Sequence, residues 1–481
     1  MLKLLRAQPR AFHMIFTIEL WERFGFYTVQ GILIMYFVKD LGFSEAQSFY
    51  TFGAFFALVY GLVAVGGYLG DHVLGTKRTI VLGLILLALG YLALAVTDKQ
   101  HVFLALGLIC VGNGVFKANP CNLLSKCYQS YDPRLHSGFT LYYMSINIGS
   151  MGSLLIGPAL SSHYGYAYAY FVSFVGLMLG LATYGFQRKV VKDINTPVDL
   201  AAVSVKVWGL IGCGVVLLTF FCAFLLQHHY FARTTLWLII FAVLMMYFYA
   251  MYYEAPAVRK RMGVTLFLML EAIIFFVLYQ QMPTSLNLYG VHQVRSTLLG
   301  IHIDPQSFQA LNPIWIVVMS PVLAMIYNKL HEKRIAFAIP YKFAFGMILS
   351  GFSFSLLFFS RYLHDSQGMV SAAWLIASYF FQSTGELFVS GLGMAMVAEL
   401  VPQRMTGFVM GVWFLSSSVA GFIGASVASF TALPKDLQPG LPSLLIYTKA
   451  FLCIGIVTLL LGIVLWLLAK PLTRLIEQKS P

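Results

Sequence analysis

Glu19-Leu20-Trp21-Glu22-Arg23 places three charged side chains in a segment, residues 15–38, that is otherwise apolar enough to cross a membrane. A charge in the middle of a bilayer costs from about 2.5 to about 10 kcal/mol or more, so such residues normally face a partner or a water-filled cavity. On a helix, spacings of i, i+3, i+4, i+7, i+8 and i+11 form one face. The residues at these spacings are Glu19, Glu22, Arg23, Phe26, Tyr27 and Gln30. We therefore expect a membrane helix with one face turned to a functional site.

The composition places the whole chain in a membrane. Hydrophobic residues make up 59% of the 481 residues, charged residues only 10%, and the mean hydropathy is +0.80. A run of about 20 apolar residues crosses a hydrocarbon core of about 30 Å. Fourteen such runs are predicted, near 15–38, 49–69, 79–96, 102–122, 139–160, 166–186, 207–227, 233–253, 264–287, 307–328, 339–361, 370–398, 405–430 and 447–469. The basic segment before the first run shows no cleavable leader pattern. We predict an all-α polytopic membrane protein with 14 spans.

Loop charges predict the orientation. If the N-terminus is cytoplasmic, 22 lysines and arginines lie on the cytoplasmic side and 7 on the other side, with Arg23 and Lys117 inside the membrane. Positive residues concentrate in cytoplasmic loops. We therefore expect a multi-pass protein of the bacterial cytoplasmic (inner) membrane with both termini in the cytoplasm. This asymmetry accounts for the net charge of +13, which then gives no support for binding nucleic acid.

The order of the spans predicts two six-helix bundles. Six runs precede a charged stretch, residues 188–206, that has the composition of a linker, and the next two runs lack any mid-membrane charge. Six more runs follow. We expect an N-terminal bundle over 1–187, a linker with two accessory helices over 188–262 and a C-terminal bundle over 263–481. This is the layout of a transporter whose substrate binds near the middle of the membrane.

A glycine-rich loop between the second and third spans supports that layout. It reads Gly66-Gly67-Tyr68-Leu69-Gly70-Asp71-His72-Val73-Leu74-Gly75-Thr76-Lys77-Arg78. Glycines permit the close approach of helices, an acid ends a helix, and two basic residues follow. The pattern resembles the cytoplasmic loop signature of the major facilitator superfamily. An ordinary positively charged loop is the alternative interpretation.

Isolated polar residues in other spans of the N-terminal half are further candidates for the site. A buried, unpaired ammonium loses its proton or finds a carboxylate. For Lys117, in the fourth span, we expect Glu22 or Glu19 as the partner, either in the site or in a structural salt bridge. Tyr143 and Asn147 lie four residues apart in the fifth span and therefore share a face.

The charges differ in sign between the two halves of the chain. Arg23 and Lys117 are cationic in the N-terminal half, whereas Glu386 is a lone carboxylate in the C-terminal half. A zwitterion with a carboxylate at one end and an ammonium at the other would satisfy both, and charge-assisted hydrogen bonds contribute about 1.5–3 kcal/mol each. Glu271 has two open interpretations, a gate ion-pair partner or a packing residue.

Further residues suit the middle of such a substrate. Asn147 and Asn312 are expected to hydrogen-bond peptide groups. Tyr27, Tyr60 and Tyr143 are expected to form an aromatic wall. Recognition of the termini rather than the side chains would permit many sequences but only short lengths.

Four motifs resemble those of the proton-dependent oligopeptide transporter family, and the resemblance covers the whole chain. They are Glu19-x-x-Glu22-Arg23-Phe24-x-Phe26-Tyr27, Tyr142-Tyr143-x-x-Ile146-Asn147-x-Gly149-Ser150-Met151, Phe308-Gln309-x-Leu311-Asn312-Pro313 and Gly385-Glu386-Leu387. Together these motifs are highly specific. The two extra helices make the chain most similar to the bacterial dipeptide and tripeptide permease A type.

The resemblance implies a role for each residue. The peptide carboxylate would be bound by Arg23, Lys117 and Tyr27, and the amino end by Asn147, Asn312 and Glu386. Proton coupling would belong to Glu19 and Glu22, and the remaining pocket would be lined by Gln30, Tyr60, Tyr143 and Trp413. The expected function is a proton-coupled symporter that imports dipeptides and tripeptides by alternating access. We expect it to use the proton gradient without a cofactor and to act as a monomer in the lipid bilayer.

The chain departs from the family pattern at several positions. Gln30 stands where many members have a second arginine, Phe26 replaces the first tyrosine of a pair, and Met151 replaces a final leucine. Phe276 and Gln280 lie where a tryptophan and an acid are often present. These changes concern peptide preference and the route of protons.

Other classes of function fit the sequence less well. A membrane-embedded enzyme would need a nucleophile with a base, or metal ligands, at membrane depth, but all eleven histidines are predicted in loops or at span ends. A passive channel tends to show rings of like charge, and these charges are single and opposite in sign. A family relative that carries nitrate, another anion or a peptide-like compound remains the alternative. Glu386 and the Glu19/Glu22 pair favour a substrate that carries a cation.

Overall fold

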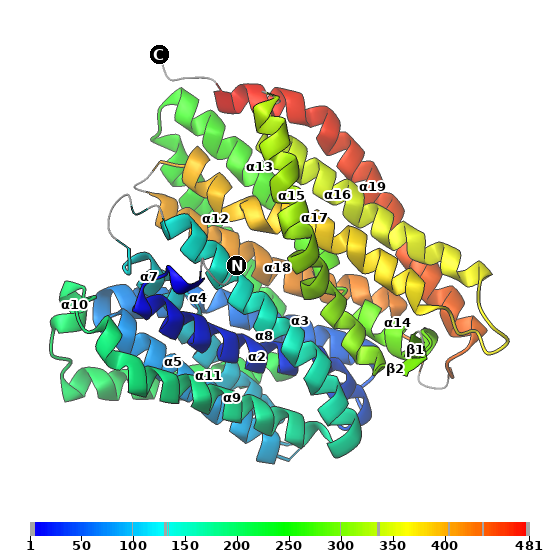
Figure 1. Cartoon of the computed structure of the whole chain (residues 1–481), viewed down its shortest axis with the longest axis horizontal. Helices are drawn as coiled ribbons and strands as arrows, with labels where there is room; N and C mark the ends of the chain where they lie inside the picture. Colours follow the sequence, from blue (N-terminus) through cyan, green and yellow to red (C-terminus); the bar gives the residue numbers. More distant parts are fainter. Residues whose placement is uncertain are drawn as a thin grey trace. The chain divides into compact units, whose positions relative to one another are not determined.

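The chain folds almost wholly into helices (Figure 1). The computed structural model describes residues 5–98, 100–128, 132, 134–298, 300–333, 337–402, 405–434 and 437–477. Within these ranges the strands are β1 (Thr297–Leu298) and β2 (Ile301–His302), which pair as a short antiparallel hairpin in a loop. Apart from this hairpin, the predicted all-α fold is confirmed.

The number of long helices agrees with the predicted spans. In the described chain, 11 helical segments are long and apolar enough to cross a membrane. Three further helices are also long enough, namely α2 (Arg10–Lys39), α8 (Arg134–Tyr164) and α17 (Ala372–Leu400). α2 falls outside the apolar group because Glu19, Glu22 and Arg23 lie within one turn of each other. The 11 apolar segments and these three helices together give the predicted fourteen.

Contacts divide the chain into two compact units. We call them the N-terminal unit, Met1–Gly42 with Ala54–Ala232, and the C-terminal unit, Phe43–Gly53 with Arg233–Pro481. These units do not test the predicted division at residues 187 and 262, which stays a prediction.

The short segment Phe43–Gly53 belongs to the C-terminal unit for two physical reasons. The backbone N–H of Leu433 donates a hydrogen bond of 2.7 Å to the buried carboxylate of Glu45. Gly53 has no side chain at a point where a Cβ would lie 2.6 Å from the carbonyl oxygen of Gly421. The first part of α3 (Glu45–Gly61) is therefore held by a hydrogen bond and by close backbone packing.

The N-terminal unit encloses α2. Figure 1 shows α2 in blue, and it packs mainly against α8 and α9. A Cβ on Gly149 would lie 2.5 Å from the carbonyl oxygen of Leu20, and one on Gly25 would lie 2.6 Å from the ring of Tyr91. Glycines at these two contacts let the helices approach closely enough to bury the polar stripe. The other helices are α4 (Val63–Tyr68), α5 (Thr76–Val96), α6 (Val102–Lys117), α7 (Asn119–Ser125), α9 (Tyr166–Gln187), α10 (Pro197–Leu200) and α11 (Val205–Gln227).

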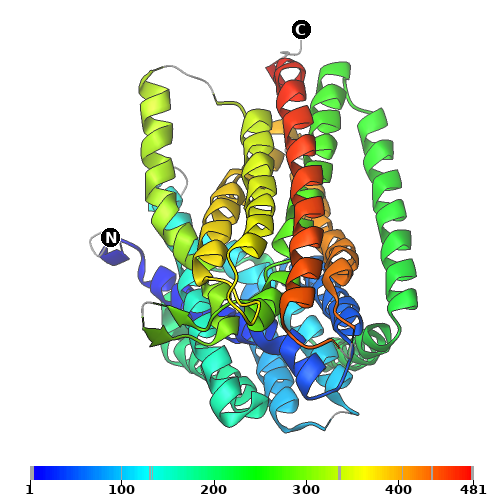
Figure 2. The same cartoon turned by 90° about the vertical axis from the view of Figure 1, so that its right-hand side faces the viewer.

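The C-terminal unit is organised around close pairs of helices. The strongest pairing joins α16 to α19, the long red helix in Figure 2. A Cβ on Gly351 would lie 2.7 Å from the backbone nitrogen of Leu459, so glycine again permits the contact. The remaining elements are α12 (His229–Tyr252), α13 (Pro256–Tyr279), α14 (Ser285–Gln293), a 3-10 helix (Pro305–Ala310), α15 (Leu311–Glu332), α16 (Ile339–Phe358), α18 (Thr406–Ala428) and α19 (Leu441–Glu477).

Candidate functional site

Arg23 forms the centre of a buried charge cluster on α2. Its Nε lies 2.5 Å from Glu22 Oε2 and its second terminal nitrogen lies 2.7 Å from Glu22 Oε1, which makes a bidentate ion pair. Glu19 Oε1 lies 3.6 Å from the same Nε. All three side chains are almost fully buried. The stripe predicted from the sequence is therefore a compact cluster of two carboxylates and one guanidinium.

The pairing of Glu22 with Arg23 is not the one that helix spacing favours. Adjacent residues on a helix do not normally face each other, whereas residues three or four apart do. Here the long arginine side chain turns back to reach its neighbour, and its guanidinium lies 4.9 Å from the ring centre of Phe26. Both oxygens of Glu22 are occupied as a result.

Asn113 on α6 completes the surroundings of Glu22. Its Nδ2 donates a hydrogen bond of 3.4 Å to Glu22 Oε1, and the side chain is fully buried. Sequence reasoning missed this residue. The signal was a polar side chain between two glycines, Gly112-Asn113-Gly114, in an otherwise apolar run.

Lys117 makes no direct ion pair with Glu19 or Glu22 within the described ranges, and its partnership with either acid stays a prediction. No carboxylate within the described ranges lies at ion-pair distance from its ammonium group, which instead sits 5.0 Å from the ring centre of Tyr60. Arg23 already occupies both oxygens of Glu22, and Asn113, one helical turn before Lys117, faces the same carboxylate. The ammonium is left as a cation over an aromatic ring, an interaction worth about 0.5–2 kcal/mol.

The remaining predicted residues of the N-terminal unit lie on the same elements. Asn147 on α8 is buried and donates a hydrogen bond of 2.9 Å to the carbonyl oxygen of Tyr143, whose side chain is 40% exposed. On α2, Tyr27 packs edge-on against Phe26 with ring centres 5.5 Å apart, and Gln30 is buried. Their contact with a substrate stays a prediction.

In the C-terminal unit, Glu386 and Asn312 are brought together. Asn312, in the first turn of α15, donates 2.7 Å to Glu386 Oε2 and 3.1 Å to the hydroxyl of Ser383. Glu386 and Ser383 are three residues apart on α17 and therefore share a face. Sequence reasoning missed Ser383, which gave no signal beyond its neighbour Thr384. The arrangement holds one carboxylate in place with an amide and a hydroxyl beside it.

Trp413 and Glu271 lie inside the C-terminal unit. Trp413 is buried, with its ring edge-on to Phe276 at 5.7 Å, and a Cβ on Gly393 would overlap the indole. Whether Trp413 also touches a substrate stays a prediction. Glu271 is buried, and its Oε1 makes no hydrogen bond within the described part of the chain, so an ion-pair role is not seen there.

The glycine-rich loop is fixed by an asparagine that follows α6. Asn119 Nδ2 donates to the carbonyl oxygens of Val115 at 2.9 Å and Gly66 at 3.0 Å. A Cβ on Gly70 would overlap Asn119 Oδ1. Gly70 is therefore required for this contact, which agrees with the glycines of the superfamily signature.

The end of this loop is also tied to the linker that precedes α11. Lys77 donates its backbone N–H to Asp199 Oδ1 at 3.4 Å and its ammonium to Asn195 Oδ1 at 2.5 Å. Arg78 donates 2.9 Å to the carbonyl oxygen of Ala201. Burial raises the pKa of Asp199, but hydrogen bonds from Thr196 and the Lys77 backbone outweigh that effect and hold the pKa below its usual range. The linker is thus ordered and is attached to the end of the glycine-rich loop by hydrogen bonds.

Comparison with known proteins adds independent support. Residues 77–441 match the POT family. A protein of Aeromonas hydrophila named dipeptide and tripeptide permease B is 48% identical over 476 residues, which cover 98% of this chain and 95% of the relative. A protein of Salmonella typhimurium with the same name is 47% identical over 475 residues, and dipeptide and tripeptide permease A of Proteus mirabilis is 46% identical over 472 residues; each alignment covers 98% of this chain, with 97% and 96% of the respective relative.

Solved structures of other proteins are similar to this chain over almost its whole length. A structure described as a bacterial homologue of the human drug peptide transporters PepT1 and PepT2 has a TM-score of 0.86 and 34% identity, covering 97% of this chain and 99% of that chain. A structure of tetrameric PepTSo2 has a TM-score of 0.86 and 33% identity, covering 96% and 98%. The fold described above is therefore that of these transporters.

Proposed function

The chain belongs to the POT family, whose fold is of the major facilitator type, and from this premise we propose that it imports dipeptides and tripeptides together with protons by alternating access. One observation carries the proposal. The N-terminal unit holds two cations, the buried Arg23 and the half-buried Lys117, whereas the C-terminal unit buries the carboxylate of Glu386 beside Asn312. A free peptide is a zwitterion with one charge of each sign, and it matches this division.

The peptide carboxylate is assigned to the cations of the N-terminal unit. Lys117 is the better candidate for direct contact, because no carboxylate within the described ranges forms a direct ion pair with it and its ammonium lies over the face of the Tyr60 ring. Arg23 already interacts with the carboxylates of Glu22 and Glu19, so it attracts the peptide carboxylate mainly by longer-range electrostatics. Tyr27 and Tyr143 form the aromatic wall of the site. Gln30 provides a neutral amide where many family members have a second arginine.

The amino end of the peptide is assigned to Glu386. Asn312, which also donates to the hydroxyl of Ser383, donates to one of its oxygens and fixes the orientation of the carboxylate. A charged group pre-oriented in this way binds an ammonium without losing much side-chain freedom. Asn147 and Asn312 serve the peptide groups, and Trp413 closes the C-terminal part of the pocket.

Proton coupling is assigned to Glu19 and Glu22. Glu22 is joined to Arg23, so a proton on Glu22 weakens a bond that otherwise holds the guanidinium. Glu19 has one oxygen, Oε2, that is buried and makes no hydrogen bond within the described ranges, and it can accept a proton without breaking one. The two acids thus link the proton to the cations that meet the peptide.

We also propose the cellular setting. The chain is assigned to the bacterial inner membrane with both termini in the cytoplasm, on the basis of the loop charges. It is assigned to act as a monomer, because all the candidate residues come from one chain. The energy source is the proton gradient, and no cofactor is required.

Uptake into proteoliposomes tests the proposal. Purified protein is reconstituted, and entry of labelled dialanine is followed with and without an inward proton gradient. We expect accumulation above the external concentration only with the gradient. Uptake that ignores the gradient would contradict proton coupling, and uptake of nitrate in place of dialanine would contradict the peptide assignment.

A further inference from the structure

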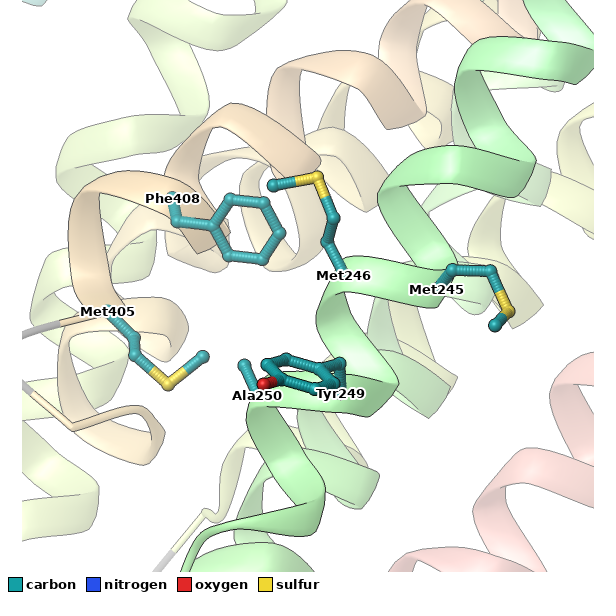
Figure 3. Close-up of a pocket in the computed structure, with 6 residues that line it drawn as sticks. All are labelled: Met245, Met246, Tyr249, Ala250, Met405 and Phe408. Atoms are coloured by element: carbon teal, nitrogen blue, oxygen red, sulfur yellow. The ribbon is translucent and has the colours of Figure 1, made fainter.

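The C-terminal unit contains an apolar groove that the transport site does not use. It has a volume of about 550 Å³ and is lined by Met245, Met246, Tyr249 and Ala250 of α12 and by Met405 and Phe408 at the start of α18. Figure 3 shows Met246 and Tyr249 on one side, with Phe408 and Met405 opposite them. We refer to these six residues as the α12–α18 groove.

The groove opens toward lipid. α12 is long and apolar enough to span a membrane, and only 11% of its most apolar stretch is buried. Met246 is 58% exposed and Tyr249 68% exposed on this helix. In a span, exposed apolar side chains meet acyl chains instead of water, and methionines adapt to irregular shapes.

Tyrosines mark the level at which the groove meets the membrane surface. Tyr249 packs against Tyr253 with ring centres 5.0 Å apart, and Tyr252 packs against Tyr253 at 5.4 Å. Tyrosines of this kind concentrate at the boundary between hydrocarbon and headgroups. The groove therefore begins at the headgroup level and runs into the hydrocarbon.

A cluster of positive charge lies at the same level. Three consecutive basic residues, Arg259, Lys260 and Arg261, follow the turn between α12 and α13. Arg259 donates 2.7 Å to the carbonyl oxygen of Tyr252 and lies over its ring, so it is held at the end of α12. Glu254 is the single acid of this turn, which leaves the turn positively charged.

Arg261 offers a donor that has no hydrogen-bond partner in the part of the chain that the structure describes. Its Nε is buried and makes no hydrogen bond within the described residues. Its neighbour Met262 accepts a hydrogen bond of 2.8 Å from Tyr247 on α12, which fixes Arg261 close to that helix. A buried guanidinium nitrogen without an acceptor is a natural place for an anionic oxygen.

We propose that the α12–α18 groove binds one anionic glycerophospholipid. An acyl chain fills the groove, and the phosphate group is bound by Arg261 and Arg259 beside the tyrosines. Because positive residues concentrate on the cytoplasmic side of a membrane protein, this lipid comes from the cytoplasmic leaflet. The lipid fills the space between the accessory helix α12 and α18 and fastens these two helices to each other within the C-terminal unit.

Native mass spectrometry of the detergent-solubilised protein tests the site. Phosphatidylglycerol and phosphatidylcholine of the same acyl length are added in turn, and retained lipid is counted. We expect one phosphatidylglycerol to be retained far better than phosphatidylcholine. A photoreactive phosphatidylglycerol, with its diazirine in the acyl chain, should label the peptides that contain Met245–Ala250 or Met405–Phe408.

Substitutions separate the two halves of the site. Ala250→Phe fills the groove and should abolish specific retention, whereas Gly214→Phe on α11, where a Cβ meets nothing within 4 Å, is the matched control and should leave it unchanged. Arg259→Gln with Arg261→Gln should lower the preference for phosphatidylglycerol roughly tenfold or more. If Ala250→Phe lowers the melting temperature, Met246→Gln tests the groove without adding volume.

Three outcomes would overturn the proposal. Equal retention of the two lipids would remove the role of charge. Unchanged retention in both Ala250→Phe and Met246→Gln would remove the groove. Displacement of the lipid by free glycerol phosphate at equal concentration would mean that the arginines bind a soluble anion without an acyl chain.

Discussion

Arg23 shows how one residue sets the character of the site. It is bound by Glu22 in a bidentate pair and lies 3.6 Å from Glu19, and all three are buried. Removing one partner of a buried ion pair leaves an uncompensated charge and costs about 3–5 kcal/mol. Protonation of Glu22 changes the electrostatic free energy of this cluster by a comparable amount. That amount is enough to shift the equilibrium between two conformations of a transporter.

Glu22→Gln should abolish gradient-driven accumulation of dialanine while leaving exchange of peptide across the membrane partly intact. Glutamine keeps the size of the side chain but cannot take up or release the proton. Accumulation and counterflow are measured in the same proteoliposomes, with Glu332→Gln, an exposed acid at the end of α15, as the control. Concentrative uptake by Glu22→Gln would rule Glu22 out as a coupling residue.

Glu386→Gln should raise the apparent KM for free dipeptides roughly tenfold or more, because a charge-assisted hydrogen bond is lost. The glutamine side chain retains an oxygen that can accept from Asn312, so the fold should be kept. For the wild type, N-acetyl dialanine should compete poorly, since it has no ammonium. Equal competition by acetylated and free dialanine would show that Glu386 does not bind the amino end.

Among the α-helices whose bounds are given above, α10 is the shortest and the least expected. It has four residues, yet Thr196 and Asp199 cap it reciprocally and Asp199 also accepts from the backbone of Lys77. The linker is thereby attached to the glycine-rich loop. A stretch that the sequence suggests is a plain connector has a defined structural role.

Asp199→Ala should lower the stability of the folded protein by about 1 kcal/mol, the usual cost of losing a helix cap. The folded state holds the pKa of Asp199 below its usual range, so the contribution is present at neutral pH and is lost as the pH falls through the lowered value. The difference in melting temperature between the wild type and Asp199→Ala should therefore shrink in acid. Asp193→Ala, at an exposed position nearby, is the control. An equal loss of stability in that variant would contradict the stabilising role of Asp199.

The elements differ in how far the sequence predicts them. Long apolar runs predicted the membrane helices, because only a helix satisfies the backbone inside lipid. The pairing inside the site was not predictable in the same way. Lys117 was expected to meet a carboxylate, but the conformation of the Arg23 side chain and the position of Asn113 decide which groups reach Glu22. Spacing along a helix gives the face of a residue and leaves open how far a long side chain bends.

At the scale of the whole molecule, the division of charge between the two units predicts selection by length. A chain of n residues spans at most about 3.3–3.6 Å per residue, so each added residue changes the distance between the termini by one such step. In the proposed binding mode both termini are held, and one residue too few leaves a buried charge unpaired at several kcal/mol.

Competition by an alanine series checks this prediction. Dialanine and trialanine should inhibit uptake of labelled dialanine, whereas alanine and tetra-alanine should inhibit it little. The four compounds share one side chain, so length is the variable. Strong inhibition by alanine or tetra-alanine would show that the two termini are not recognised together.

The bond between Glu22 and Arg23 also bears on how the protein enters the membrane during synthesis. Its partners are neighbours in one helix, so the bond forms without any other helix. α2 leaves the ribosome before α6 and α8 exist. With the guanidinium already neutralised, the translocon releases into lipid a helix with one remaining carboxylate in place of three separate ions. Lys117 follows three spans later in a helix that contains no acid, and by then Tyr60 is already in place to receive it.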